Sequence, residues 1–155
     1  MRFVLVDEIL DMVPGRSIRG VKTLGLEEDV FRDHFPGFPV VPGVLLTEMM
    51  AQAAGICLDA EDPARGKSML AQIRAASFRR WVRPGEQAEI QAEIKSSTPS
   101  FATAACTVAV GGTVAANAEL LFSFVPREQF AADFRDELLA RYAARSGGAS
   151  PARDP

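Results

Sequence analysis

Apolar and polar residues alternate most regularly in the second half of the chain, where they predict an antiparallel sheet. Residues 86–95 alternate with a period of two, which is typical of a strand buried on one face only. Residues 101–110 and 113–125 are two further apolar runs joined by Gly111-Gly112, the strongest hairpin signal in the sequence. The apolar set of the first strand comprises Ala88, Ile90, Ala92 and Ile94.

A different pattern, apolar on almost every side, begins at Pro42 or Gly43 and runs to Asp59. Proline suits the first position of a helix, and a helix that is apolar nearly all round is a buried one. The polar exceptions are spaced by four, three and four residues, so they share one helix face. They are Glu48, Gln52, Gly55 and Asp59, of which Asp59 is expected at the surface where the helix ends.

The remaining elements of the first half have shorter signals. Residues 1–12 fit a helix or a strand equally well, and Pro14-Gly15 and Pro84-Gly85 predict turns. The other expected elements are a strand at Ser17–Leu24, a short helix or turn at Glu27–Asp33, a loop at Glu61–Lys67 and a strand at Met69–Val82.

After Pro126, apolar residues recur at every fourth position and predict an amphipathic helix from about Arg127 to Arg145. The tail from Ser146 to Pro155 is rich in Gly, Ser, Pro and charge, which predicts disorder. The whole pattern predicts one α+β domain over residues 1–145, in which an antiparallel sheet wraps around a single buried helix. The apolar residues of the C-terminal helix are Phe130, Phe134, Leu138 and Tyr142.

Composition narrows the classes of function. The net charge of −3 gives no general attraction to nucleic acid, and a single histidine without a CxxC motif argues against a metal site. Cys57 and Cys106 lie in apolar runs and are expected to be buried, reduced thiols. No apolar run approaches the roughly 18 residues of a membrane span, and no secretory leader pattern is present. We therefore expect a cytoplasmic protein.

The only histidine, His34, stands at the start of a loop that three prolines and two glycines stiffen before the buried helix. The alternative is that His34 is an ordinary loop histidine and Glu48 an ordinary surface carboxylate. An unpaired carboxylate in an apolar helix is costly, which favours an acid/base pair if the two residues meet in space. The backbone amides of Gly43 and Val44, at the helix N-terminus, could bind a carbonyl oxygen on which negative charge develops.

The loop and helix start, HFPGFPVVPGVL with Glu48 and Ala51-Gln52-Ala53, resembles the pattern HFPGHPxxPGVLxxEAxAQ. That pattern is the signature of the (3R)-hydroxyacyl-[acyl-carrier-protein] dehydratases of the FabZ type, which have the hot-dog fold. Residues 78–87, FRRWVRPGEQ, are similar to the FRRPVxPGDQ stretch of the same family. Residues 5–10 together with Pro14-Gly15 resemble the N-terminal part of the family.

The resemblance implies a homodimer, or a trimer of such dimers, in which His34 of one subunit meets Glu48 of the other. The substrate would be a 3-hydroxyacyl thioester of acyl carrier protein or coenzyme A, dehydrated to a trans-2-enoyl thioester without a cofactor. The implied substrate contacts are Gly43, Val44, Leu45, Phe38, Met49 and Gln52, with Gln52 orienting Glu48. Four nearby arginines could dock an acidic carrier or a phosphate, or could be solvated strand residues. They are Arg74, Arg79, Arg80 and Arg83.

Four departures from the family pattern leave other readings open. Phe38 replaces the second histidine, Trp81 replaces a proline, residues 59–72 lack a tyrosine, and the segment after Pro126 is longer. The alternatives are a hot-dog acyl thioesterase and a non-catalytic acyl-binding partner subunit. A thioesterase needs no acid at C3, and a retired site has no need for a buried carboxylate, so intact His34 and Glu48 favour the dehydratase.

Overall fold

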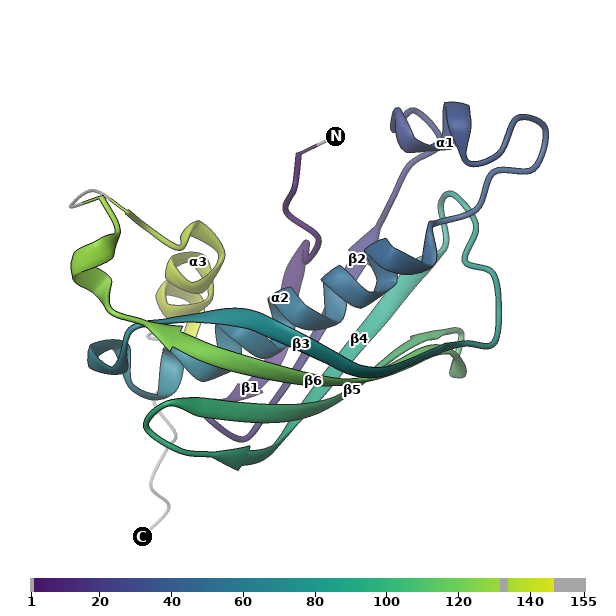
Figure 1. Cartoon of the computed structure of the whole chain (residues 1–155). Helices are drawn as coiled ribbons and strands as arrows, with labels where there is room; N and C mark the ends of the chain where they lie inside the picture. Colours follow the sequence, from purple (N-terminus) through teal and green to yellow (C-terminus); the bar gives the residue numbers. More distant parts are fainter. Residues whose placement is uncertain (1, 132–133, 147–155) are drawn as a thin grey trace, which may run out of the picture.

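One six-stranded antiparallel sheet curves around one long helix, α2, in a computed structural model that describes residues 2–131 and 134–146 (Figure 1). Along the sheet the strands follow the order β1-β2-β4-β5-β6-β3. The strands are β1 (Glu8–Val13), β2 (Ser17–Thr23), β3 (Lys67–Phe78), β4 (Gln87–Ser97), β5 (Phe101–Val110) and β6 (Thr113–Val125). The helices are α1 (Val30–Asp33), α2 (Gly43–Glu61), the 3₁₀ turns η1 (Pro63–Arg65) and η2 (Arg127–Gln129), and α3 (Glu137–Ser146).

The sheet confirms the strand predictions for the second half of the chain. Strands β5 and β6 form the expected hairpin, whose turn residues Gly111 and Gly112 have φ angles of 56° and 78°. Both angles lie in the left-handed region that glycine adopts without a steric cost. In β4, Ala88, Ile90 and Ala92 are buried against the core as their alternation predicts.

Helix α2 begins at Gly43 as predicted and ends two residues later than predicted, at Glu61. Its small residues Ala53, Ala54 and Cys57 are completely buried, so the sheet can approach the helix closely. Among the described helices α2 alone has the length and mean hydropathy, 1.2, of a membrane span, but 67% of the 18-residue stretch is buried inside the fold. It is therefore the buried core helix of this fold.

Three predictions about the middle of the chain need correction. Strand β3 starts earlier and ends at Phe78 rather than Val82, because the Arg79 and Arg80 amides turn to the Ala115 carbonyl. Asp59 was expected at the surface and is buried, with a side chain only 2% exposed. It is stabilised there by an ion pair with Lys67 and by a 2.8 Å hydrogen bond from the Ser68 amide.

The predicted C-terminal helix is wrong in its start. Only Arg127–Gln129 is helical at the beginning of that span, as a 3₁₀ turn, and α3 begins at Glu137. Asp136 precedes α3 and caps it, because its side chain accepts a 3.0 Å hydrogen bond from the Leu139 amide. The predicted disorder of the tail falls on residues 147–155, outside the described residues, and Ser146 belongs to α3.

Both cysteines are buried and free, as predicted. Burial raises the pKa of the Cys106 thiol to about 12. Burial also raises the pKa of Cys57, against a smaller lowering effect of nearby backbone amides. Neither thiol is therefore poised as a nucleophile.

Candidate active site

His34 lies at the C-terminal end of α1, half-buried, where the loop to α2 begins. Its Nδ1 lies 3.1 Å from the carbonyl oxygen of Val40. A carbonyl oxygen only accepts hydrogen bonds, so in the neutral ring Nδ1 carries the hydrogen and Nε2 carries the free lone pair. The Val40 amide in turn donates to the His34 carbonyl at 3.1 Å, and Phe35 stacks on the imidazole at 4.0 Å between ring centroids. The loop thus holds a histidine whose Nε2 can accept a proton.

Glu48 is on α2, half-buried, and Gln52 one turn further along fixes it. The Gln52 Nε2 group donates to the Glu48 Oε1 atom at 3.0 Å. Gln52 is itself fastened to the N-terminal segment, because its Oε1 accepts from the buried Leu5 amide at 2.8 Å and its Nε2 reaches the Phe3 carbonyl at 3.3 Å. In the part of the chain that the structure describes, Glu48 therefore has one oxygen oriented by Gln52 and a second oxygen without a hydrogen-bond partner.

The N-terminus of α2 lies five residues before Glu48, at Gly43. Pro42 precedes the helix and its carbonyl accepts from the Leu45 amide at 2.9 Å. The Gly43 and Val44 amides have no hydrogen-bond partner among the described residues. A Cβ atom on residue 43 would come within 3.0 Å of the Phe78 ring, so glycine lets β3 pack against this helix end. Two free amides at a helix N-terminus form a natural site for developing negative charge.

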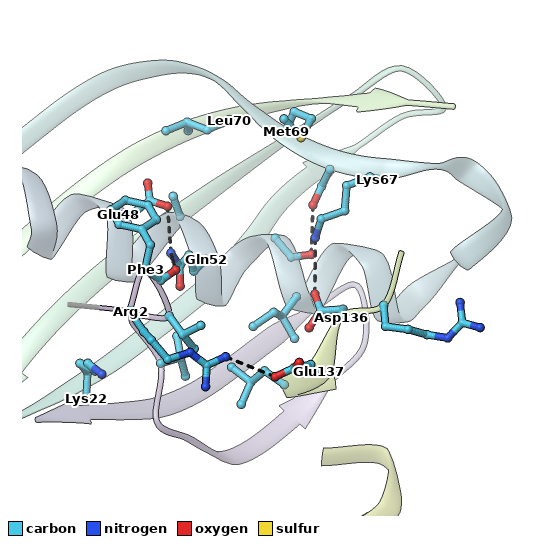
Figure 2. A pocket seen from close by; sticks show the side chains of 18 of the residues that line it. Arg2, Phe3, Lys22, Glu48, Gln52, Lys67, Met69, Leu70, Asp136 and Glu137 are labelled. Carbon is cyan, nitrogen blue, oxygen red and sulfur yellow. Dashed lines mark hydrogen bonds and ion pairs between the residues drawn. The ribbon is translucent and has the colours of Figure 1, made fainter. Parts of the chain in front are cut away.

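A cavity of about 770 Å³ opens beside Glu48, between α2, the N-terminal segment, β3 and the C-terminal segment (Figure 2). The polar face of α2 that the spacing predicts forms one wall, through Glu48, Gln52 and Gly55. Apolar side chains from the N-terminal segment, the helix and the sheet line part of the rest, namely Val6, Ile56, Met69, Leu70 and Phe122. The Glu48 carboxyl group therefore lies beside a chamber whose walls are partly apolar and partly charged.

The family model of the FabA-like domain matches residues 1–119 of this chain. The chain belongs to the FabA-like family. It is 36% identical over 126 residues to the 3-hydroxyacyl-[acyl-carrier-protein] dehydratase FabZ of Bacillus pumilus, across 81% of this chain and 88% of that protein. It is 41% identical over 128 residues to the FabZ of Geotalea uraniireducens, with the same two coverages of 81% and 88%.

A solved structure extends the likeness of fold beyond these relatives. The dehydratase heterocomplex ApeI:P of Xenorhabdus doucetiae superimposes with a TM-score of 0.65 at 18% identity, across 91% of this chain and 90% of that one. The predicted hot-dog fold is therefore confirmed, with α3 packed beside it (Figure 1).

Two departures of this FabA-like chain from the family pattern touch each other. Phe38 meets Trp81 edge to face, with ring centroids 5.1 Å apart, and the Arg83 guanidinium lies 5.1 Å from the Phe38 ring centroid. The Val41 amide donates to the Val82 carbonyl at 2.7 Å and holds the two segments together. The loop that carries His34 is thus tied to the segment after β3.

The other predicted contacts of this FabA-like chain are spread along α2 and β3. Among the predicted substrate contacts, only Gln52 lines the cavity; Phe38 and Val44 are exposed, and Leu45 packs against the core. Met49 is buried in that core, at 1% exposure. Within one chain, His34 and Glu48 make no hydrogen bond or ion pair with each other among the described residues.

The four arginines of the expected docking cluster have different surroundings. Arg80 makes an ion pair with Glu86 and donates to the Val110 carbonyl at 3.2 Å, so its charge is already used inside the fold. Arg79 donates to the Asn117 side chain at 3.3 Å. Arg74 and Arg83 are exposed, and Arg83 lies over Phe38.

Sequence reasoning missed several charged groups in the cavity wall, Lys67 among them. Lys67 bridges the buried Asp59 and, at 3.5 Å, Asp136 of the C-terminal segment. The polar stripe of α2 offered a signal, since it ends at Asp59 and a buried carboxylate needs a cation. Nothing local pointed to Lys67, which the fold brings there from the start of β3.

Proposed function

We propose that His34 of one subunit and Glu48 of a second subunit dehydrate (3R)-hydroxyacyl thioesters to trans-2-enoyl thioesters in acyl-chain biosynthesis. The observation that carries the proposal is the anchoring of both groups: Val40 leaves Nε2 of His34 free, and Gln52 leaves one Glu48 oxygen free beside the cavity. The FabZ relatives, which are named as 3-hydroxyacyl-[acyl-carrier-protein] dehydratases, support the same reaction.

In this mechanism Nε2 of His34 takes the proton from C2 of the substrate. The C2–H electron pair forms the C2–C3 double bond while the C3–O bond breaks, and the Glu48 carboxyl group gives the departing hydroxyl a proton so that it leaves as water. The Gly43 and Val44 amides would bind the thioester oxygen as negative charge develops on it. A proton passes back from His34 to Glu48 before the next turnover. No redox change occurs.

The exposed edge strand supports assembly into a homodimer. Strand β3 ends the sheet and pairs only with β6, and from Met69 onward its residues are exposed. Large apolar side chains lie along it: Met69, Leu70, Ile73 and Phe78. An edge of this length and apolarity is an aggregation hazard unless a second strand pairs with it, and a second β3 would do so in a C2 dimer. A trimer of such dimers is the larger assembly we propose.

The proposed substrate is carried by acyl carrier protein or coenzyme A in the cytoplasm. The exposed arginines Arg74, Arg79 and Arg83, of which Arg83 lies against Phe38 in the His34 loop, would attract the carrier's acidic surface or the phosphate of phosphopantetheine. Arg80 is the weakest member of this group because Glu86 already neutralises it.

Mixing two inactive variants tests the shared site. His34→Ala and Glu48→Gln should each lower kcat by about 10² to 10⁴ while the protein stays folded. When the two variants are refolded together at equal amounts, half of the C2 dimers are hybrids, and each hybrid has one intact site of two. About a quarter of wild-type activity should therefore return. A mixture as inactive as the separate variants would contradict the shared site, and full activity in either variant would contradict its catalytic role.

A further inference from the structure

The cavity beside Glu48 extends along α2 toward the C-terminal segment, away from the proposed reaction centre. In Figure 2, Glu48 lies near one end of the exposed helix face, and Lys67 with Asp136 lies near the other. Eleven residues separate Glu48 from Asp59, the helix residue that pairs with Lys67, which corresponds to about 16 Å along the helix axis. The chamber is therefore longer than the atoms that react.

The far wall of this chamber is built by the C-terminal segment Phe134–Arg141. Five of its side chains line the cavity together with Asp136, namely Phe134, Arg135, Glu137, Leu138 and Arg141. Two contacts fasten the segment to the rest of the fold: Lys67 lies 3.5 Å from Asp136, and Arg2 lies 3.4 Å from Glu137. Leu138 and Tyr142 also pack against the core.

Apolar and charged side chains both line the chamber. Leu70, Met69 and Ile56 lie along it, and its far end carries the Lys67–Asp136 ion pair. An apolar chain that reached this end would have to remove water from the ion pair without replacing its hydrogen bonds, which is unfavourable. The segment Phe134–Arg141 therefore disfavours long apolar chains in two ways: it fills space at the far end of the chamber, and it places charge there.

We propose that the segment Phe134–Arg141 is the specificity-determining wall of the acyl site and restricts this chain to thioesters of short and medium acyl length. The inference rests on the proposed dehydratase function and deepens it by naming the substrate class. It also gives a role to the part of the chain after residue 119, which the FabA-like family model does not match.

Two neighbouring leucines of α3 provide a matched test. Leu138 and Leu139 are both partly buried against the core, but only Leu138 lines the cavity. The measurement is kcat/KM for a series of thioesters from 3-hydroxybutanoyl to 3-hydroxytetradecanoyl, on one carrier, with wild type and each alanine variant. Leu138→Ala should raise the ratio of long-chain to short-chain kcat/KM by about fourfold for each methylene newly admitted. Leu139→Ala should leave this ratio unchanged.

Thermal unfolding of each variant keeps the comparison interpretable. If Leu138→Ala does not fold, Phe134→Ala replaces it, because Phe134 lines the same wall and is 37% exposed. An unchanged ratio of long-chain to short-chain kcat/KM in the folded wall variant, or an equal shift in Leu139→Ala, would contradict the proposed role of the segment Phe134–Arg141. A wild-type protein that dehydrates no thioester of the series would instead overturn the proposed function.

Discussion

Removing the amide of Gln52 should reveal how firmly Glu48 must be held. Gln52→Leu keeps the approximate size of the side chain but deletes the 3.0 Å hydrogen bond to Glu48 and the acceptor of the Leu5 amide. Leu5 is completely buried, so water could not replace Gln52 as the hydrogen-bond acceptor of its N–H group. A buried unsatisfied donor costs about 1–3 kcal/mol.

The expected loss of stability can be measured directly. For a chain of this size, each kcal/mol lowers Tm by roughly 2–4 °C, so Gln52→Leu should lower Tm by about 2–12 °C. The change should also lower kcat by about tenfold or more, because an unanchored carboxyl group spends less time in the orientation that meets the substrate. KM should change less than kcat, since Glu48 is proposed to act on the departing hydroxyl group.

Gln91→Leu is the matched control, because Gln91 is an exposed residue of β4. It removes the same amide without touching the site, and its Tm and kcat should stay near wild-type values. The reasoning is refuted if Gln52→Leu keeps wild-type kcat at temperatures where it is folded, since Gln52 would then have no positioning role. A KM effect with unchanged kcat would refute it too.

Three further predictions concern parts of the fold around the site. A double-mutant cycle of Phe38→Ala and Trp81→Ala, followed by chemical denaturation, should give a coupling free energy of about 0.5–1.5 kcal/mol; additive effects would mean that the rings do not interact. Asp59→Asn should destabilise the protein by about 3–5 kcal/mol in the same assay, since it breaks a buried ion pair, whereas Glu93→Gln in the exposed Glu93–Lys95 pair should cost under about 1 kcal/mol. Cys106 should react slowly with a thiol reagent at neutral pH in the folded protein and rapidly in denaturant. Because burial raises its pKa from 9.0 to about 12, the neutral thiol's contribution to stability is complete below pH 9 and falls as pH rises toward 12.

The core of the fold was readable from the sequence because its signals are local and long. The period of two in β4 and the apolar run of α2 each extend over many residues, so that one exception does not hide them, and the Gly111-Gly112 pair marks a turn by itself. The stripe of α2 was also readable, and Glu48, Gln52 and Gly55 do face one cavity. Helix geometry alone is enough to bring those three residues together.

The errors fall where a distant partner decides the local structure. Asp59 reads as a helix-end surface residue until the start of β3 brings Lys67 to it. The helix after Pro126 was predicted to start too early because its every-fourth-residue pattern continues through Phe130 and Phe134, whose ring centroids lie 5.3 Å apart in a tilted arrangement. The decisive signal was Asp136, an N-cap residue inside the predicted helix.

Phe38 and Trp81 show why departures from a family pattern are best judged in pairs. They are 43 positions apart in the sequence, where Phe38 is the replacement of a histidine and Trp81 the replacement of a proline, with no sign that the two changes are related. The backbone hydrogen bond from Val41 to Val82 fixes their segments side by side, so a change at either position alters the surroundings of the other. An exposed phenylalanine alone would gain little from its position, but against Trp81 and Arg83 it gains an edge-to-face contact and a cation over its ring. The two replacements therefore act together on the loop that carries His34, whose Nδ1 lies 3.1 Å from the Val40 carbonyl oxygen.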